Sequence, residues 1–363
     1  MIRLIHAADF HLDSPFSALT EEMAVERRRE QRQLLEKLKA AVIEKDAHIV
    51  LLSGDLLDGT RYYAETYSQL IDIFSRIPSY IFISPGNHDY YSGRSPYAGM
   101  EWPENVHIFK TTQIEGISIP ELNLTVWGAA FIAEESYPIL SGFKVRDTSG
   151  INIMTLHGDL GNPASKYNPV SEEDIAASGL DYLGLGHQHT FSGLKKAGGT
   201  YYAYPGCPEG RGFDETGEKG IVSAFVDKSG CKLEFLPMGG RKYEVLEVDV
   251  SSRDDIYEAI EAAIPDVCDR DIYRLVLKGS WDQKPDTNAI IKRFESRFYR
   301  LEVRDATDIR RDIWEQAGED SLRGLFLRAM KERYDQAKDE QDREAVVLAV
   351  RYGLAALENR DEI

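Results

Sequence analysis

The chain is poor in cysteine and has no long run of apolar residues. Its 363 residues include three cysteines, Cys207, Cys231 and Cys268, without a Cys-x-x-Cys pair. An odd number without such pairs favours reduced thiols over disulfides or a thiolate zinc site. No window reaches the roughly 18 to 20 apolar residues that span a bilayer, so we expect no membrane segment. The first ten residues, MIRLIHAADF, lack the features of a signal peptide, so we expect a cytoplasmic protein.

The chain is also short of positive charge. It has 43 lysines and arginines against 61 aspartates and glutamates, which gives a formal net charge of −18 at pH 7. Proteins that bind nucleic acid on their own normally neutralise phosphates with clustered Lys and Arg side chains, so this balance argues against a stand-alone nucleic-acid binder. The shares of hydrophobic residues, 42%, and charged residues, 29%, are those of an ordinary globular protein, and the length allows two domains.

Up to about residue 240, short apolar runs rich in β-formers alternate with polar helical stretches, which predicts a layered α/β domain. The strands that we expect are IRLIHAA, HIVLLSG, SYIFISP, LNLTVWG, INIMTLH, DYLGLG, TYYAYP, GIVSAFV and KLEFLPM. Residues 21 to 45 predict the first crossover helix. The residues that recur there at helical spacing are Leu34, Leu35, Leu38, Ala41 and Val42.

Residues 241 to 310 predict a small second domain. The runs YEVLEVDV, IYRLVLKG and YRLEVRDA alternate with expected helices around 254–264 and 286–297, which makes a β-α-β-α-β unit. Residues 311 to 363 predict two amphipathic helices. Their expected apolar faces consist of Leu322, Leu325, Phe326, Ala329 and Met330 in the first and of Val346, Val347, Val350, Leu354 and Leu357 in the second.

Five short stretches rich in Asp, His and Asn each follow or end a predicted strand. They are HAADFHLDSPF at 6–16, SGDLLDG at 53–59, PGNHDYY at 85–91, LHGDL at 156–160 and GHQH at 186–189. Loops at the carboxyl ends of strands in an open α/β sheet lie together, so we expect one site. Carboxylate, imidazole and amide groups without thiolates suit manganese, iron or zinc. Asp55 is the expected bridge, because one carboxylate can bind two ions about 3.5 to 4 Å apart.

The order D-x-H, G-D-x-x-D, G-N-H-D, H-G and G-H-x-H resembles the calcineurin-like metallophosphoesterases. HAADFHLDSPF and the stretch YPGCPEGRGFDETGEKG at 204–220 further resemble the DNA-repair exonuclease branch, the SbcD- and YhaO-type nuclease subunits. The resemblance implies a four-layer α-β-β-α metallophosphoesterase sandwich over residues 1–240. It also implies a small α+β capping domain of the DNA-recognition kind at 241–310 and C-terminal helices at 311–363 that can bind a partner.

The same resemblance implies two divalent metal ions per chain, manganese first, with iron, zinc or magnesium as alternatives. One ion would be held by Asp9, His11, Asp55 and His189, and the other by Asp55, Asn87, His157 and His187. His88 matches the histidine that stabilises the transferring phosphoryl group and helps the leaving oxygen depart, and Asp89 would orient it. The implied reaction is phosphodiester hydrolysis by a hydroxide that bridges the two metals.

Other polar residues have competing interpretations. We expect His6, His48 and His107 to be structural, and Asp13, Asp58 and Asp159 to cap loops or support ligands. The run Arg27, Arg28, Arg29 and Arg32 is interleaved with glutamates, which favours a solvated helix face over a nucleic-acid contact. Arg211 is a candidate for binding phosphate, and Tyr90 or Tyr91 for stacking on a base, with chance placement equally plausible. Cys207 stands where the relatives usually have Asn or Ser.

These observations lead to three hypotheses of function. The first is a metal-dependent DNA exonuclease and endonuclease in DNA repair, a homodimer whose C-terminal helices bind an SMC-like coiled-coil ATPase. The second is a small-molecule phosphodiesterase or pyrophosphohydrolase, which the acidic charge favours. The third is a metal-bound scaffold of the ATPase complex, and the complete set of ligands argues against it.

Overall fold

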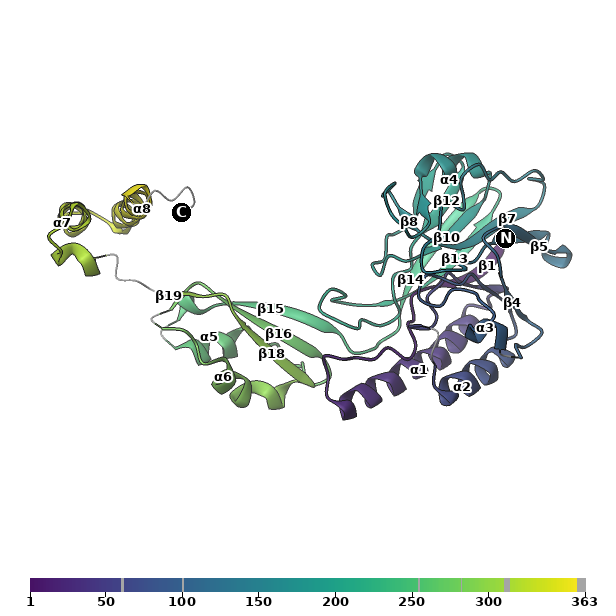
Figure 1. The fold of residues 1–363 in the computed structure, drawn as a ribbon, viewed down its shortest axis with the longest axis horizontal. Coiled ribbons are helices and arrows are strands. Elements are labelled where there is room, and N and C mark those ends of the chain that lie inside the picture. Colours follow the sequence, from purple (N-terminus) through teal and green to yellow (C-terminus); the bar gives the residue numbers. More distant parts are fainter. Residues whose placement is uncertain (60–61, 100, 254, 282, 310–313, 358–363) are drawn as a thin grey trace. The chain divides into compact units, whose positions relative to one another are not determined.

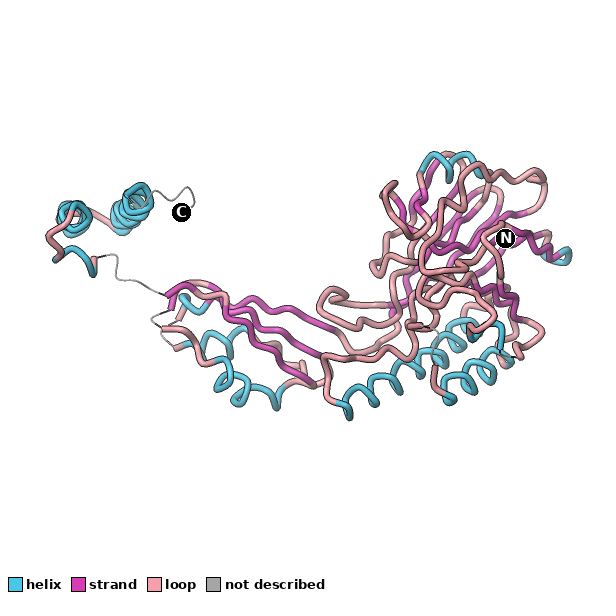
Figure 2. Tube along the Cα trace, viewed as in Figure 1, coloured by secondary structure: helices cyan, strands magenta, loops and turns pink. Residues whose placement is uncertain are grey.

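The computed structural model describes residues 1–59, 62–99, 101–253, 255–281, 283–309 and 314–357 (Figures 1 and 2). It divides into two compact units, one of residues 1–245 with 270–272 and the other of residues 246–269 with 273–363. Parts of the predicted C-terminal segment, residues 311–313 and 358–363, lie outside the described residues. No helix in the described ranges is both long and apolar enough to cross a membrane.

The first unit contains two six-stranded sheets. The first sheet has the order β14 (Gly230–Pro237), β13 (Gly220–Asp227), β1 (Ile2–Ala7), β2 (Ile49–Leu52), β3 (Tyr80–Ile83) and β4 (Val106–Ile108). The second has the order β11 (Lys195–Ala197), β12 (Thr200–Ala203), β10 (Tyr182–Gly186), β7 (Ile151–His157), β6 (Leu124–Gly128) and β5 (Glu115–Ile119). Strands β1 to β4 are parallel, as are β6, β7, β10 and β12.

Helices cover the outer face of each sheet (Figure 1). Helices α1 (Glu21–Glu44) and α2 (Ala64–Ser75) pack on the first sheet, and α4 (Glu172–Ser178) packs on the second. The side chains of each inner strand alternate between the two faces: Ile49 lies in the core between the sheets, whereas Val50 lies under α1 and α2. Three apolar layers therefore separate four layers of secondary structure, and the predicted α-β-β-α sandwich is confirmed.

The nine predicted strands of this unit and its first crossover helix are all present. The sequence patterns missed β4, β5 and β11, which are short and lie at or next to sheet edges, together with the helix α3 (Pro96–Gly99) and the small pair β8 (Asp159–Leu160) and β9 (Pro169–Val170). The strands β4, β5 and β11 have few buried side chains, one in each, so they leave no continuous apolar run that a pattern could reveal.

The second unit is built on the predicted β-α-β-α-β pattern. Its elements are β15 (Tyr243–Asp249), α5 (Ile256–Ala263), β16 (Ile272–Lys278), α6 (Thr287–Phe294) and β18 (Arg300–Asp305), with the strand order β15-β16-β18. The first residues of β15, 243–245, and the first residue of β16 belong to the first unit. A short pair, β17 (Ser280–Trp281) and β19 (Asp308–Ile309), was not predicted. The apolar core of this unit lies between the sheet and its two helices.

The two predicted C-terminal helices are α7 (Leu322–Asp335) and α8 (Glu340–Leu357), which pack against one another. Their contact matches the predicted faces only in part: Phe326 packs against Gly353 of α8 and Val350 is fully buried. Gly324 and Leu327 are the buried residues of α7, whereas Leu322 and Leu325 are exposed by 70% and 57%. The division of the chain at residue 311 stays a prediction.

The arginine run on α1 corrects a second expectation. The side chain of Arg27 is fully buried, and its guanidinium donates hydrogen bonds to Glu209 (2.9 Å) and Glu30 (2.6 Å). It also donates to the carbonyl oxygen of Gly210. Arg29, by contrast, is exposed. Arg27 therefore ties the first helix to the loop that follows β12, and only part of the run is a solvated face.

We expect Arg27→Ala to lower the free energy of unfolding by about 3 to 5 kcal/mol, because it leaves the buried carboxylate of Glu209 without its partner. Urea titration of the metal-free protein measures this change. Arg29→Ala is the matched control and should change stability by less than about 0.5 kcal/mol. An equal effect of the two substitutions would contradict the structural role of Arg27.

Candidate metal centre

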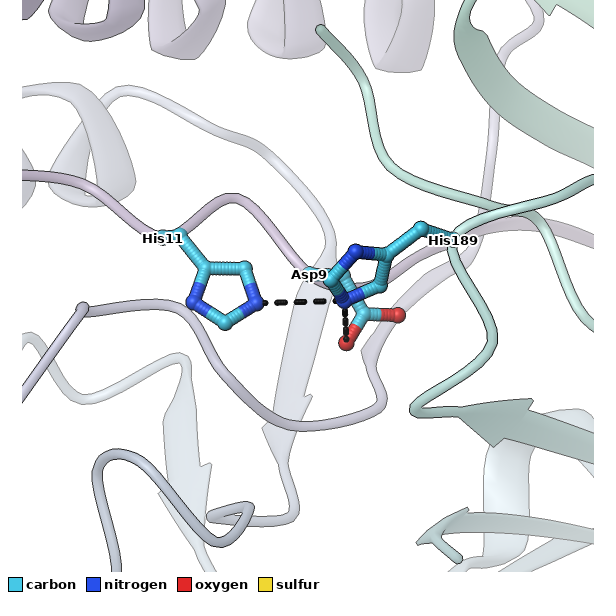
Figure 3. A group of neighbouring side chains, drawn as sticks. All are labelled: Asp9, His11 and His189. Atoms are coloured by element: carbon cyan, nitrogen blue, oxygen red, sulfur yellow. Dashed lines mark hydrogen bonds and ion pairs between the residues drawn. The ribbon is translucent and has the colours of Figure 1, made fainter. Parts of the chain in front are cut away.

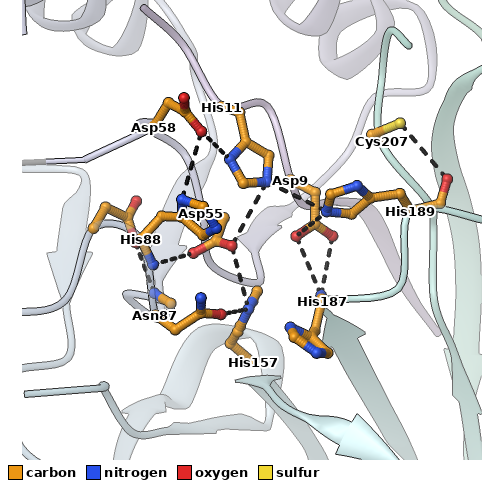
Figure 4. Close-up of polar contacts among 12 residues, drawn as sticks. Asp9, His11, Asp55, Asp58, Asn87, His88, His157, His187, His189 and Cys207 are labelled. Carbon is orange, nitrogen blue, oxygen red and sulfur yellow. Dashed lines mark hydrogen bonds and ion pairs between the residues drawn. The ribbon is translucent and has the colours of Figure 1, made fainter. Parts of the chain in front are cut away.

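Five loops bring polar side chains from both sheets to one place (Figure 4). Asp9 and His11 follow β1, Asp55 follows β2, and Asn87 follows β3. The second sheet contributes three histidines: His157 ends β7, while His187 and His189 follow β10. Because these strands are parallel within each sheet, their carboxyl ends meet at one edge. The convergence that the motifs predicted is therefore present.

The backbone at this edge turns sharply. Asp9, His11, Asp55 and His187 all have positive φ, at 55°, 43°, 51° and 109°. Residues with side chains rarely adopt this region, and such conformations concentrate at functional sites. Hydrogen bonds hold them in place: the amide of Asp9 donates to the carbonyl of Gly54 (3.0 Å), and the amide of His11 donates to that of Asp55 (2.9 Å).

The first group of candidate ligands is Asp9, His11 and His189 (Figure 3). The Nε2 atoms of His11 and His189 lie 3.3 Å apart, and Nε2 of His189 lies 3.6 Å from the Asp9 carboxylate. Both Nδ1 atoms are engaged by carboxylates, that of His11 by Asp58 (2.8 Å) and that of His189 by Glu215 (2.6 Å). Since a carboxylate accepts the Nδ1 proton, each Nε2 presents a lone pair to the other. Two facing lone pairs beside a carboxylate are satisfied by a cation.

The second group is formed by Asp55, Asn87 and His157. Nδ1 of His157 donates to the carbonyl oxygen of Ser53 (2.9 Å), so its Nε2 is an acceptor. That atom lies 3.0 Å from Oδ1 of Asn87 and 3.5 Å from Oδ2 of Asp55. Three acceptor atoms thus face one another, and the oxygen and nitrogen donors fit a divalent cation of the manganese, iron or zinc kind.

Asp55 lies between the two groups. Its Oδ2 atom is 3.6 Å from Nε2 of His11 and 3.5 Å from Nε2 of His157. This position is the one that the predicted bridging role requires. The ring of His187 lies beside that of His157, with centroids 5.2 Å apart, and its amide donates to the Asp9 carboxylate (3.0 Å).

Burial perturbs the ionisation of these groups. It raises the pKa of Asp9 well above its usual value, and the charge of Asp55 adds to this effect. Burial and the charge of Asp89 raise the pKa of Asp55 to about 7. Burial lowers the pKa of His157 and of His187 to about 4 and holds that of His11 well below its usual value. The metal-free site therefore disfavours charge of either sign, and a bound cation would compensate the carboxylates.

His88 lies at the open side of the site, with 45% of its side chain exposed. The structure does not support the prediction that Asp89 orients it. The Asp89 carboxylate accepts hydrogen bonds from the amides of Gly86 (2.8 Å) and Leu57 (3.1 Å) and from the hydroxyl of Tyr97. The carboxylate next to His88 is Asp58, whose Oδ1 is 3.5 Å from Nδ1. Asp89 therefore fixes the loop, and Asp58 is the group placed to orient His88.

Arg211, the predicted phosphate contact, lies beside the site but is engaged by carboxylates. Its Nη1 donates to Asp58 (3.1 Å) and its Nη2 to Glu215 (3.0 Å). Burial opposes ionisation of Glu215, but the hydrogen bond from His189 and the charge of Arg211 outweigh it, so the pKa of Glu215 lies well below its usual value. Of the predicted stacking tyrosines, Tyr90 is half-buried and Tyr91 packs against the core.

The sequence interpretation missed two residues of this region. The first is Glu215, which lies in the stretch 204–220 and orients His189. A histidine that binds a metal through Nε2 usually donates its Nδ1 proton to an acceptor, so a search for that acceptor could have pointed to Glu215. Tyr167 lies with its ring 5.3 Å from that of His187 and is 38% exposed. Cys207 is fully buried, with its thiol next to the backbone of His189, and burial raises its pKa, which fits the predicted reduced thiol.

Comparisons with known proteins point to one family. A family model described as calcineurin-like phosphoesterase matches residues 2–191. The uncharacterized metallophosphoesterase YhaO of Bacillus subtilis (strain 168) is 29% identical over 301 residues, which cover 77% of this chain and 72% of that protein. The structure of TT1561 of Thermus thermophilus is similar at 12% identity, with a TM-score of 0.41 over 65% of this chain and 99% of its own. A dimetal phosphatase from Danio rerio is similar at 12% identity, with a TM-score of 0.39 over 64% of this chain and 98% of its own.

Asp55→Asn should separate stability from metal binding. Burial raises the pKa of Asp55 to about 7 in the folded chain, whereas in the unfolded chain this carboxyl loses its proton from about pH 4 upward. The free energy of unfolding of the metal-free protein therefore falls as the pH rises through this window up to about 7. In EDTA we expect the variant to melt at a higher temperature than wild type at pH 7.5, with the difference shrinking towards pH 5. Added Mn²⁺ should stabilise only the wild type.

Differential scanning calorimetry at both pH values measures these shifts. Asp227→Asn, at the last residue of β13, is the control and should show the same response to Mn²⁺ as wild type. A metal-free Asp55→Asn protein that melts below wild type at pH 7.5 would contradict the electrostatic account of the site.

Proposed function

The chain belongs to the calcineurin-like phosphoesterase family, and within that family we propose that it is a two-metal phosphodiesterase whose substrate is DNA. Phosphoester hydrolysis is supported by the family and by the clustered candidate ligands. The observation that carries the proposal is the position of Asp55, within 3.6 Å of ring nitrogens from both groups and next to the open side where His88 lies. Two divalent cations held there would activate a water molecule and draw negative charge from a phosphate.

His88 is suited to protonate the leaving oxygen. Its half-exposed ring contrasts with the fully buried His11 and with the buried His157, so it can reach a substrate at the mouth of the site. Asp58, whose Oδ1 lies 3.5 Å from Nδ1 of His88, fixes the direction of the ring. The ring of His88 also lies against that of His11, with centroids 4.7 Å apart. These contacts place a proton donor beside the candidate ligands.

The charges around the site favour a diester over a monoester. Arg211 shares the Asp58 carboxylate with His88, and its charge is already balanced by Asp58 and Glu215. A terminal phosphate carries more negative charge than a phosphate linked on both sides. Because Arg211 is paired with two carboxylates, its charge is not available to balance a second phosphate charge. The site therefore suits a singly charged diester better than a doubly charged monoester.

The proposal of DNA rests on the resemblance of residues 6–16 and 204–220 to the repair nucleases and on the second unit. The net charge of −18 argues that this chain does not hold DNA alone. We therefore include in the proposal a homodimer and a basic, coiled-coil ATPase partner bound by α7 and α8. Apolar side chains remain exposed on these helices, with Leu322 at 70%, Leu348 at 52% and Tyr352 at 53%.

A small-molecule phosphodiesterase is the second candidate, because the same acidic charge favours small substrates over a polyanion. The two candidates differ in one observable. Only the nuclease should cleave linear DNA, alone or with its ATPase, whereas both should cleave bis-p-nitrophenyl phosphate.

We expect Mn²⁺-dependent cleavage of bis-p-nitrophenyl phosphate and of linear DNA, with EDTA abolishing both. His88→Ala should lower kcat by about 10² to 10⁴-fold, because it removes the proton donor, and Asp58→Asn should lower it less. His48→Ala is the matched control, since His48 accepts a hydrogen bond from the amide of Arg3, outside the site. Full activity of the His88 variant on both substrates would overturn the assignment, and diester cleavage without DNA cleavage in the presence of the ATPase would favour the second candidate.

A further inference from the structure

A cavity of about 250 Å³ opens beside the candidate metal centre. It is lined by residues 14–19, which follow His11 in the chain, and by Asp58, Arg211 and Tyr243. All of these residues belong to the first unit. Neither the two-metal chemistry nor the proton donor uses this cavity.

The loop that forms one wall is held firmly. The hydroxyl of Ser14 donates to the carbonyl oxygen of His11 (2.8 Å), and the amide of Leu19 donates to that of Phe16 (2.9 Å). Just before it, the carboxylate of Asp13 accepts hydrogen bonds from the amide of Tyr63 (2.8 Å) and from a threonine hydroxyl on α2. Phe16 is buried with a φ of 47°, a conformation that persists only where the surroundings fix it. The cavity is therefore preformed, so a ligand need not order the loop.

Asp58 is shared between the cavity and the metal centre. Its Oδ1 atom is 2.8 Å from Nδ1 of His11, 3.5 Å from Nδ1 of His88 and 3.1 Å from Nη1 of Arg211. Asp58 and Arg211 also line the cavity. The cavity thus begins on the side of His88, where the leaving group or the retained group of a diester would extend.

The lining suits a flat, partly polar group. Pro15, Ala18 and Leu19 offer apolar surface, whereas Ser14 and Ser17 offer hydroxyls. The volume lies just below the roughly 300 Å³ at which cavities for drug-sized ligands begin. A duplex, whose major groove alone is about 12 Å wide, does not fit such a space. One base with its sugar does, and a base offers both a π-face and polar edges.

A positively charged side chain, that of Arg28, contacts the same loop and could bind a nucleic-acid backbone. Arg28 on α1 donates to the carbonyl oxygen of Pro15 (3.4 Å), and its guanidinium lies 5.3 Å from the ring centroid of Tyr63, which is 48% exposed. Arginine next to an exposed aromatic ring is a combination that binds single-stranded nucleic acid. The chain has a net charge of −18, and this pair is joined to the cavity wall through the carbonyl oxygen of Pro15.

We propose that this cavity binds the nucleoside attached to the phosphate that is cleaved, so that the enzyme selects an unpaired nucleotide over a diester with other substituents. The inference rests on the proposed function, since it assigns a subsite to that reaction. It makes residues 14–19 a determinant of specificity, separate from the residues that carry out the hydrolysis.

The test fills the cavity without touching the catalytic groups. Ala18→Trp and, separately, Ser17→Trp place a large side chain at exposed positions of the lining. Ala40→Trp, at an exposed position near the other end of α1, is the matched control. Each protein is assayed with Mn²⁺ on thymidine 5′-(p-nitrophenyl phosphate), on its 3′ isomer and on bis-p-nitrophenyl phosphate.

Both filling variants should raise KM for a thymidine ester by about tenfold or more, while kcat/KM for bis-p-nitrophenyl phosphate stays within about twofold of wild type. The control should match wild type on every substrate. Unchanged activity on bis-p-nitrophenyl phosphate also shows that each variant is folded. The isomer that is affected tells which side of the phosphate the cavity serves.

Equal losses on all substrates, or no loss on either thymidine ester, would overturn the inference and leave the proposed function standing. A wild-type protein that cleaves bis-p-nitrophenyl phosphate but neither thymidine ester would overturn it as well. A wild-type protein that cleaves no diester would overturn the proposed function, and the inference with it.

Discussion

The site depends on one electrostatic constraint: three imidazole rings each point a nitrogen lone pair at another hydrogen-bond acceptor. His11, His157 and His189 each give the Nδ1 proton to an oxygen, of Asp58, of the Ser53 carbonyl and of Glu215 respectively. Each Nε2 atom is thereby an acceptor, and each faces a second acceptor within 3.3 Å. Such an arrangement is unfavourable in a water-poor interior unless a cation occupies it. The oxygens that fix the rings thus decide what the site can bind.

The surrounding fold supplies the rigidity that this arrangement needs. The candidate ligands follow strands whose side chains are packed on both faces, with the inner core between the sheets and a helix-covered core outside each of them. Close packing at Gly186, where an added Cβ would lie 1.8 Å from the carbonyl oxygen of Ser53, brings the end of β10 against the end of β2. The second sheet can therefore deliver its histidines to the carboxylates of the first sheet, because nothing larger than glycine separates the strands.

Much of this could be predicted from the sequence, since buried parallel strands and the loops after them leave a strong pattern. The nine apolar runs and the long first helix were found in that way, whereas the set of seven candidate ligands came from the resemblance of the motifs to the metallophosphoesterases. The support groups were harder to assign. Asp89 follows His88 in the chain, yet its carboxylate accepts a hydrogen bond from Gly86 in the same loop. Asp58, in the loop after β2, is the carboxylate next to His88. Likewise, nothing local shows that Arg27 is buried, because its partner Glu209 lies 182 residues away. Contacts of this kind depend on how the layers meet, which periodicity does not encode.

The position of β1 within the first sheet has a consequence for how the chain is made. β1 lies between β2 and β13, and β13 begins only at Gly220. While the ribosome is still translating the intervening residues, β1 can pair with β2, but its other edge stays open. An unpaired apolar edge is a template for association with other nascent chains. The open edge of β1 can be paired only after β13, which ends at residue 227, has been synthesised. Until then Asp9 and His11, which follow β1, lie next to an incomplete sheet.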